Sequence, residues 1–238
     1  MLVEIWSDVV CPWCYVGKRR FEAALARFPH RDEVEVVWRA FELDPRAPAE
    51  LTGDYAGRLA RKYGVSPDRA AAMVDGMTEA AARDGLRFRF DIARPGNTLD
   101  AHRVIHLALE RGVQDAVKER LLLGYFTEGE PIGDRPTLAR LAAEAGLDAD
   151  EVRTVLDGGA YADEVRADEA RAAAHGITAV PFFVIDEALG VSGAQPADLL
   201  LSALEQGWAR ARPIRLVAGD AAADGASGSA CDGDACAV

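Results

Sequence analysis

The position of the strand-like segments restricts the fold of this chain more than any other feature, because these segments occur only near its two ends. Residues 2–8 and 34–41 contain the alternating and β-branched runs that are typical of strands. The same signal returns only at 177–185, followed by a short segment around Val191. Since the strands of one sheet must lie side by side, the two ends of the chain must meet. We therefore predict an α/β fold with a sheet assembled from both ends.

The residues between these strands form a helical block. Ala-rich amphipathic stretches follow one another, with glycines where the stretches end. The helices predicted over the whole chain cover residues 15–28, 51–63, 67–84, 98–111, 115–127, 136–145, 149–156, 163–175 and 196–208. We accordingly divide the chain into an α/β part at 1–43, a helical insertion domain at 44–176, a second α/β part at 177–216 and a tail at 217–238. The tail is acidic and poor in large apolar residues, so we expect it to be flexible.

Composition excludes several classes of partner. Lysine and arginine number 27 against 39 aspartate and glutamate, which gives a formal net charge of −12. A chain of this sign does not hold nucleic acid or anionic membranes by bulk electrostatics. No stretch approaches the roughly 20 consecutive apolar residues of a transmembrane helix. The first residues contain no secretory-signal pattern, so we expect a cytoplasmic protein without nucleic-acid or membrane partners.

A Cys-Pro-Trp-Cys motif lies where the first strand runs into the first helix. The unpaired N–H groups and positive end of that helix would stabilise the thiolate of Cys11, which makes Cys11 the expected nucleophile. Cys14 lies one turn further along and could resolve a mixed disulfide formed at Cys11. Between them, Pro12 and Trp13 determine how many donors face the sulfur. The motif therefore predicts a redox-active dithiol.

A zinc site is the main alternative interpretation of such a motif. Zinc would need two further ligands, and the remaining cysteines, Cys231 and Cys236, lie in the tail. His102 and His106 are spaced as two metal ligands on one helix face, but no convincing further ligand accompanies them, so helix packing is favoured. We expect no metal site.

Three separated segments resemble the FrnE-type subgroup of the DsbA family of thiol oxidoreductases. They are Ser-Asp-Val-Val-Cys-Pro-Trp-Cys-Tyr-Val-Gly at 7–17, Asn-Thr-Leu-Asp-Ala-His-Arg at 97–103 and Val-Pro-Phe-Phe at 180–183. The resemblance covers nearly the whole chain and implies a thioredoxin-like fold interrupted by an all-helical insertion. It also implies that the Val180–Pro181 bond is cis and lies against the cysteine pair. The backbone of Val180 would then pair with an extended substrate peptide.

The function implied by this resemblance is thiol–disulfide oxidoreductase or isomerase activity on protein disulfides. The resemblance implies no cofactor beyond the redox-active disulfide, and it leaves glutathione open as a co-substrate. The alternative is a glutathione-dependent isomerase or transferase of the 2-hydroxychromene-2-carboxylate isomerase or kappa type. Those enzymes use a single activated Ser or Cys, so the presence of Cys14 argues against them. A non-enzymatic accessory role is a third hypothesis. Redox direction, physiological substrate, pathway and oligomeric state stay open.

A second cysteine pair, Cys231 and Cys236, lies in the tail with Asp and Gly residues between its members. These residues favour the turn that would let the two sulfurs meet. The pair resembles the C-terminal redox pair that some FrnE-type proteins carry. It could exchange with Cys11, and the alternative is a pair of incidental thiols.

Several polar residues have two interpretations. Glu4 and Asp8 precede the motif, and we favour solvated charges at a strand end over a proton acceptor for Cys14. Asn97 is expected to cap a helix, with Asp100 as the second member of the capping pair. In related enzymes an Asn and a His–Arg pair face the active-site cleft. A substrate-lining role for Asn97, His102 or Arg103 is therefore the weaker hypothesis.

Overall fold

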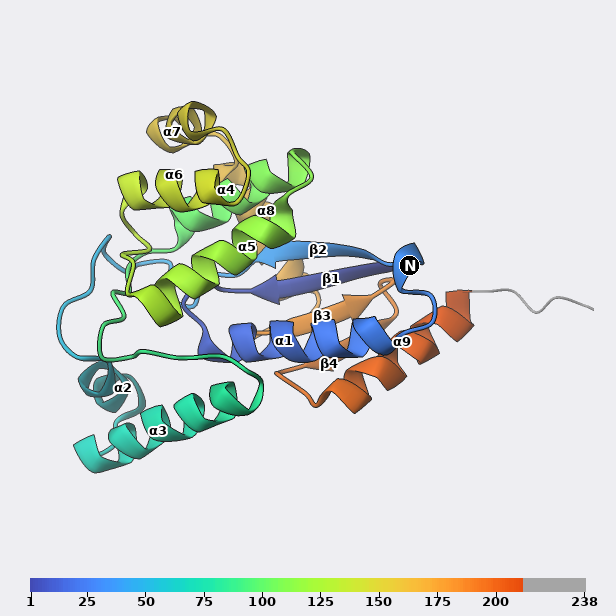
Figure 1. Ribbon diagram of the computed structural model, residues 1–238, viewed down its shortest axis with the longest axis horizontal. Helices are drawn as coiled ribbons and strands as arrows, with labels where there is room; N and C mark the ends of the chain where they lie inside the picture. The colour runs from blue at the N-terminus through green and yellow to red at the C-terminus, as the bar shows by residue number, and fades with distance from the viewer. Residues whose placement is uncertain (212–238) are drawn as a thin grey trace, which may run out of the picture.

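The computed structural model describes residues 1–211, in which four strands form one mixed sheet (Figure 1). The strands are β1 (Leu2–Ser7), β2 (Glu35–Ala40), β3 (Phe182–Ile185) and β4 (Leu189–Ser192), in the order β2-β1-β3-β4. β1 pairs in parallel with β2 and antiparallel with β3, and β4 pairs antiparallel with β3. The two ends of the chain therefore meet at the β1–β3 pair, which confirms the expected α/β architecture.

Two helices cover one face of this sheet. Helix α1 (Pro12–Arg27) joins β1 to β2, and it packs beside α9 (Ala197–Ala211). Because successive side chains of a strand point to opposite faces, Val3 and Ile5 of β1 enter the apolar core shared with these helices. The side chains between and after them, Glu4 and Trp6, point to the other face, and both are buried there as well.

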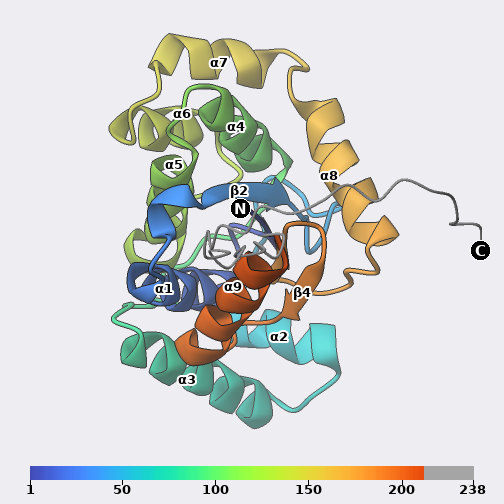
Figure 2. The same ribbon diagram turned by 90° about the vertical axis from the view of Figure 1, so that its right-hand side faces the viewer.

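The segment between β2 and β3 is helical in the described chain and divides into two groups (Figure 2). Helices α2 and α3 lie on the side of α1, whereas α4–α8 gather around β2, which α4, α5 and α8 contact. The helices are α2 (Tyr55–Tyr63), α3 (Pro67–Arg83), α4 (Leu99–Glu110), α5 (Gln114–Leu123), α6 (Arg135–Glu144), α7 (Ala149–Asp157) and α8 (Ala162–Ala174), with a 3₁₀ turn η1 (Arg31–Glu33) and a π turn η2 (Gly124–Glu128).

Three predicted elements differ from the structure. The strand expected at 177–185 is a strand only at its last four residues, because Pro181 has no N–H to donate to a ladder. Helix α2 begins at Tyr55 instead of residue 51, since Asp54 caps it by accepting a hydrogen bond from Gly57 N–H at 2.7 Å. The helix expected at 115–127 changes to the π turn after Leu123.

The division into domains at 43/44 and 176/177 stays a prediction, and the tail at 217–238 lies outside the described residues. Within residues 1–211, no helix combines the length and the apolar character needed to cross a membrane.

Candidate active site

The two cysteines of the motif lie at the start of α1, directly after β1. Cys11 occupies the N-cap position and Pro12 the first helical position, where its missing N–H costs no helix hydrogen bond. Both thiols are free and buried, with Cys11 4% and Cys14 1% exposed. Burial and the hydrogen bond that Cys14 makes to Cys11 raise the pKa of Cys14 well above its ordinary value. Cys14 is thus held as a thiol against Cys11, as a resolving cysteine would be.

The loop before β3 closes over Cys11. The Val180–Pro181 peptide bond is cis, as the resemblance implies, and the Cys11 thiol donates to the Val180 carbonyl at 3.6 Å. Gly17 of α1 makes this approach possible, because a Cβ at this position would lie 2.8 Å from Pro181 Cγ. The structure therefore places Val180 and Pro181 next to the cysteine pair.

The two residues between the cysteines differ in exposure. Pro12 is buried, whereas Trp13 is 42% exposed and projects an aromatic surface beside the motif. Tyr55 of α2, which the sequence analysis did not single out, is linked to the motif by the charge on Cys11. Burial, followed by the charge on Cys11, raises the pKa of its hydroxyl. No sequence signal links α2 to the cysteines, because only the fold of the insertion brings them together.

Asp8 is fully buried beneath the motif, so our expectation of a solvated charge is wrong. Its carboxylate accepts the Leu43 N–H at 2.8 Å and lies 3.4 Å from His102 Nε2. Burial alone would raise the pKa of Asp8, but His102, the Leu43 N–H and the charge of Lys118 together lower it. The carboxylate is therefore held in its ionised form.

Lys118 is the second buried charge at this site, and the sequence analysis missed it. Its ammonium enters from α5, is 1% exposed and donates to the Ser7 carbonyl at 3.4 Å. Burial lowers the pKa of Lys118 from 10.5 to about 8, against the raising effect of the charges on Cys14, Asp8 and Cys11. Its position could not be predicted, because Ser7 lies 111 positions away in the sequence.

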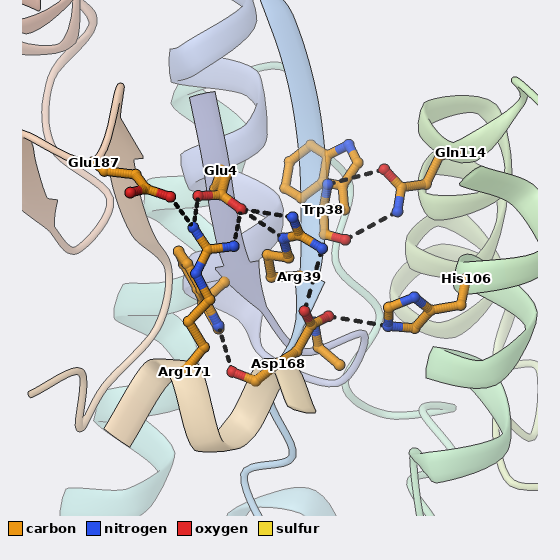
Figure 3. Close-up of polar contacts among 10 residues, drawn as sticks. Glu4, Trp38, Arg39, His106, Gln114, Asp168, Arg171 and Glu187 are labelled. Carbon is orange, nitrogen blue, oxygen red and sulfur yellow. Dashed lines mark hydrogen bonds and ion pairs between the residues drawn. The ribbon is translucent and has the colours of Figure 1, made fainter. Parts of the chain in front are cut away.

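Glu4 is also buried, at 1% exposure, so it is not a solvated charge either. Figure 3 shows its carboxylate between two guanidinium groups, those of Arg39 and Arg171. Arg39 donates to Glu4 at 2.8 Å, and Arg171 binds both carboxylate oxygens at 2.6 Å. Arg39 and the Ala40 N–H also reach the Asp168 carboxylate. This network ties α8 to β1 and β2.

His102 and His106 do not converge on a common metal site. His102 Nε2 faces Asp8, whereas His106 Nε2 lies 3.0 Å from Asp168, so each packs beside a different carboxylate. Within residues 1–211, no group of His, Cys, Asp or Glu side chains is arranged to hold a metal ion.

Asn97 and Arg103, which belong to the same segment as His102, both bind neighbouring backbone groups. The expected cap is wrong by one residue, since Thr98 occupies the N-cap position, although the Asn97 side chain accepts from Leu99 N–H at 2.9 Å. Arg103 is 3% exposed, and its guanidinium donates to the carbonyls of Ala160 and Gly158, both at 2.7 Å. Arg103 and His102, which is 1% exposed, are both buried, and a substrate-lining role for them stays a hypothesis. Cys231 and Cys236 lie outside the described residues.

Comparison with known proteins gives consistent matches over most of the chain. A family model described as a DSBA-like thioredoxin domain matches residues 2–205. The uncharacterized protein YwbO of Bacillus subtilis (strain 168) is 30% identical over 210 residues, which cover 85% of this chain and 94% of YwbO.

Solved structures show the same relationship. The crystal structure of a probable DsbA oxidoreductase from Streptomyces coelicolor is 49% identical, with a TM-score of 0.85, over 97% of this chain and 100% of that one. The cytosolic disulfide reductase DsbM of Pseudomonas aeruginosa, also solved with GSH, shares the fold at 17% identity and a TM-score of 0.60, over 88% of this chain and 100% of DsbM. The thioredoxin-like fold with helices inserted between two parts of the sheet is thereby confirmed.

Proposed function

Because the chain belongs to the family of DSBA-like thioredoxin domains, we propose that it is a thiol–disulfide oxidoreductase of the FrnE type that acts on protein disulfides through Cys11 and Cys14. The observation that carries this proposal is the pairing of two buried free thiols at a helix start. Cys11 contacts the Val180 carbonyl, and Cys14 lies behind Cys11 as its hydrogen-bond donor.

The arrangement suits a two-step exchange. In the reducing direction, the Cys11 thiolate attacks one sulfur of a substrate disulfide, forms a mixed disulfide and releases the other substrate sulfur as a thiolate. Cys14 then loses its proton and attacks Cys11, which forms the Cys11–Cys14 bond and releases the second substrate thiolate. The substrate gains two electrons and the cysteine pair loses them. The reverse sequence oxidises a substrate dithiol.

Substrate binding is assigned to the surface around Cys11. The backbone of Val180 is suited to pair with an extended peptide, and the exposed ring of Trp13 offers apolar contact area beside the reacting sulfur. Pro12 and Pro181 hold these two segments in place. The resemblance of the fold to DsbM, which has been solved with GSH, supports glutathione as a co-substrate.

Three further parts of this proposal come from the sequence. Cys231 and Cys236 are proposed as a second redox pair that exchanges with Cys11. No cofactor other than the redox-active disulfide is proposed. We also propose a cytoplasmic location.

Insulin reduction by dithiothreitol and refolding of scrambled ribonuclease test the proposed function. The wild type should accelerate at least one of these reactions, and Cys11→Ser should abolish the effect. Cys14→Ser should instead accumulate mixed disulfides between Cys11 and substrate, because Cys11 can attack but the intermediate is not resolved. Full activity in Cys11→Ser would refute the proposal. Isomerase turnover with glutathione that survives Cys14→Ser would favour the glutathione-dependent alternative.

A further inference from the structure

Lys118 has an environment that a structural lysine rarely occupies. The chain contains only three lysines, Lys18, Lys62 and Lys118, so nearly all of its 27 basic side chains are arginine. The Lys118 ammonium is 1% exposed, lies 5.6 Å from the centroid of the Trp38 ring, and donates one long hydrogen bond, to Ser7. Among residues 1–211, no carboxylate pairs with it within 4 Å. A buried ammonium without such a partner lowers the stability of the fold, so a role in packing alone does not explain a lysine at this position.

Lys118 donates to the carbonyl of Ser7, directly before Asp8 and four residues before Cys11, and the charges that act on it are those of the two sulfurs, Asp8 and Lys18. The charges on Cys14, Asp8 and Cys11 raise the pKa of Lys118, whereas burial and Lys18 lower it. The influence is mutual, because Lys118 lowers the pKa of Cys14 against the larger effects of burial and Cys11. The hydrogen bond to Ser7 fixes the amine at the backbone that leads into the cysteine segment.

We infer that Lys118, supplied by helix α5 of the inserted segment, accepts the proton that Cys14 releases when Cys14 resolves the mixed disulfide at Cys11. This inference rests on the proposed function. The neutral amine takes the thiol proton and becomes an ammonium while Cys14 Sγ attacks Cys11 Sγ. The Cys11–Cys14 bond forms, the bond between Cys11 and the substrate sulfur breaks, and that sulfur leaves as a thiolate. In the opposite direction, the ammonium returns its proton to Cys14.

Asp8 is the competing proton acceptor, and its electrostatics argue against this role. The pKa of Asp8 is lowered from 3.8, because His102, the Leu43 N–H and the charge of Lys118 outweigh the effect of burial. A proton acceptor works best when its pKa lies near the operating pH. The pKa of Lys118, lowered by burial to about 8, meets this condition, whereas a strongly ionised carboxylate does not. Asp8 instead contributes negative charge that keeps the amine basic.

Lys18 provides a matched control for Lys118. It is also 1% exposed, and its ammonium lies 5.8 Å from the centroid of the same Trp38 ring. Lys18 is paired with Glu22, and with Asp115 and Glu119 at 3.1 and 3.2 Å. Burial would lower the pKa of Lys18, but these carboxylates raise it, so Lys18 stays charged. The two lysines thus share burial and the aromatic neighbour but differ in their ability to take up a proton.

The experiment follows the reaction of the reduced full chain with one equivalent of the aromatic disulfide DTNB. Cys231→Ser and Cys236→Ser are present throughout, so that only Cys11 and Cys14 react. Release of the first thionitrobenzoate reports attack by Cys11, and release of the second reports resolution by Cys14. At pH 7, Lys118→Met should slow the second release by about 10-fold or more. Its rate should recover only at higher pH, where Cys14 ionises by itself.

Two further variants separate proton transfer from charge and packing. Lys118→Arg keeps a cation but cannot give up its proton, so it should be as slow as Lys118→Met in the second release. Lys18→Met should release the first equivalent at the wild-type rate and slow the second release far less than Lys118→Met does. Wild-type resolution in Lys118→Met, or rescue by Lys118→Arg, would overturn the inference. A wild type that never releases a second equivalent would instead refute the proposed function.

A measurement on the wild-type sequence keeps the inference testable if these variants do not fold. With ¹³C-labelled lysine, the chain gives only three Cε signals, which simplifies their assignment. Lys118 should titrate near pH 8 in the reduced protein and at lower pH in the Cys11–Cys14 disulfide form, where the sulfur charges are absent. Titration near 10.5 in both forms would overturn the inference.

Discussion

At the candidate site, single residues determine how closely helix α1 and the loop before β3 approach each other. Gly17 is the clearest case, because α1 carries Cys11 and Cys14 while Pro181 belongs to the loop that covers them. A Cβ at position 17 would lie 2.8 Å from Pro181 Cγ and 3.4 Å from Pro181 Cβ. The proline ring cannot rotate away as a flexible side chain would, so the loop itself would have to move.

Gly17→Ala is therefore expected to destabilise the protein by about 1–3 kcal/mol, as overpacking does, and to slow disulfide exchange. Gly76→Ala is the control, since Gly76 also lies within a helix but has no neighbouring atom within 4 Å of an added Cβ. Gly76→Ala should stabilise the protein by about 0.5–1 kcal/mol through helix propensity. Urea denaturation and insulin reduction measure the two effects. Equal stabilisation by both substitutions would contradict the close approach.

Among the elements, α8 depends on buried charges for its attachment to the sheet. Arg171 of α8 binds Glu4 of β1 at 2.6 Å and also Glu187 at 2.8 Å, but the two carboxylates differ in exposure. The Glu4 side chain is 1% exposed and that of Glu187 is 67% exposed. Since Glu4 also neutralises Arg39, its removal takes the buried partner from two guanidinium groups, which keep only Asp168 and Glu187 as further partners.

We expect Glu4→Ala to lower the free energy of unfolding by about 2–3 kcal/mol, because charged hydrogen bonds to two arginines are lost. Glu187→Ala removes a partner of the same arginine at an exposed position, so it should cost less than about 1 kcal/mol. Urea denaturation of the two variants gives the comparison. If both variants lost a similar amount of unfolding free energy, burial of Glu4 would not determine how much it contributes to stability.

The elements themselves could be predicted from periodicity, but the surroundings of single charges could not. Glu4 alternates with Val3 and Ile5, a pattern typical of a strand with one solvated face. In the fold α8 covers that face, and Arg171, which pairs with Glu4, is 167 positions away in the sequence. Cys11, Cys14 and Pro181 could be predicted because a motif marks them. Tyr55 and Lys118 carry no motif, and their relation to the cysteines depends on the path of the inserted helices.

On the scale of the whole molecule, the inserted helices lie on two sides of the α/β part and contribute to the same site. The charge on Cys11 acts on Tyr55 of α2, and Lys118 of α5 donates to Ser7 and is influenced by the charge on Cys14. The stability cost of the buried Lys118 should be visible in the pH dependence of unfolding. The unfolded chain keeps this proton up to about pH 10.5, whereas burial lowers the pKa of folded Lys118 to about 8.

Between these values the unfolded state binds more protons, so the stability of the wild type should rise with pH relative to Lys118→Met. Between about pH 8 and 9.5, the free energy of unfolding of the wild type should gain roughly 2 kcal/mol over that of Lys118→Met. Urea denaturation of both reduced proteins across this range measures it. A stability difference that is independent of pH would contradict the lowered pKa of Lys118.

Equilibrium titration of the full chain in glutathione redox buffers decides whether Cys11 and Cys14 act as one redox couple. Mass spectrometry of trapped peptides should identify an intramolecular Cys11–Cys14 disulfide that forms in a single two-electron transition, followed in parallel by the fluorescence of the buried Trp6. If Cys11 were found only reduced or joined to glutathione across the whole range, and never bridged to Cys14, the protein would not be a dithiol oxidoreductase.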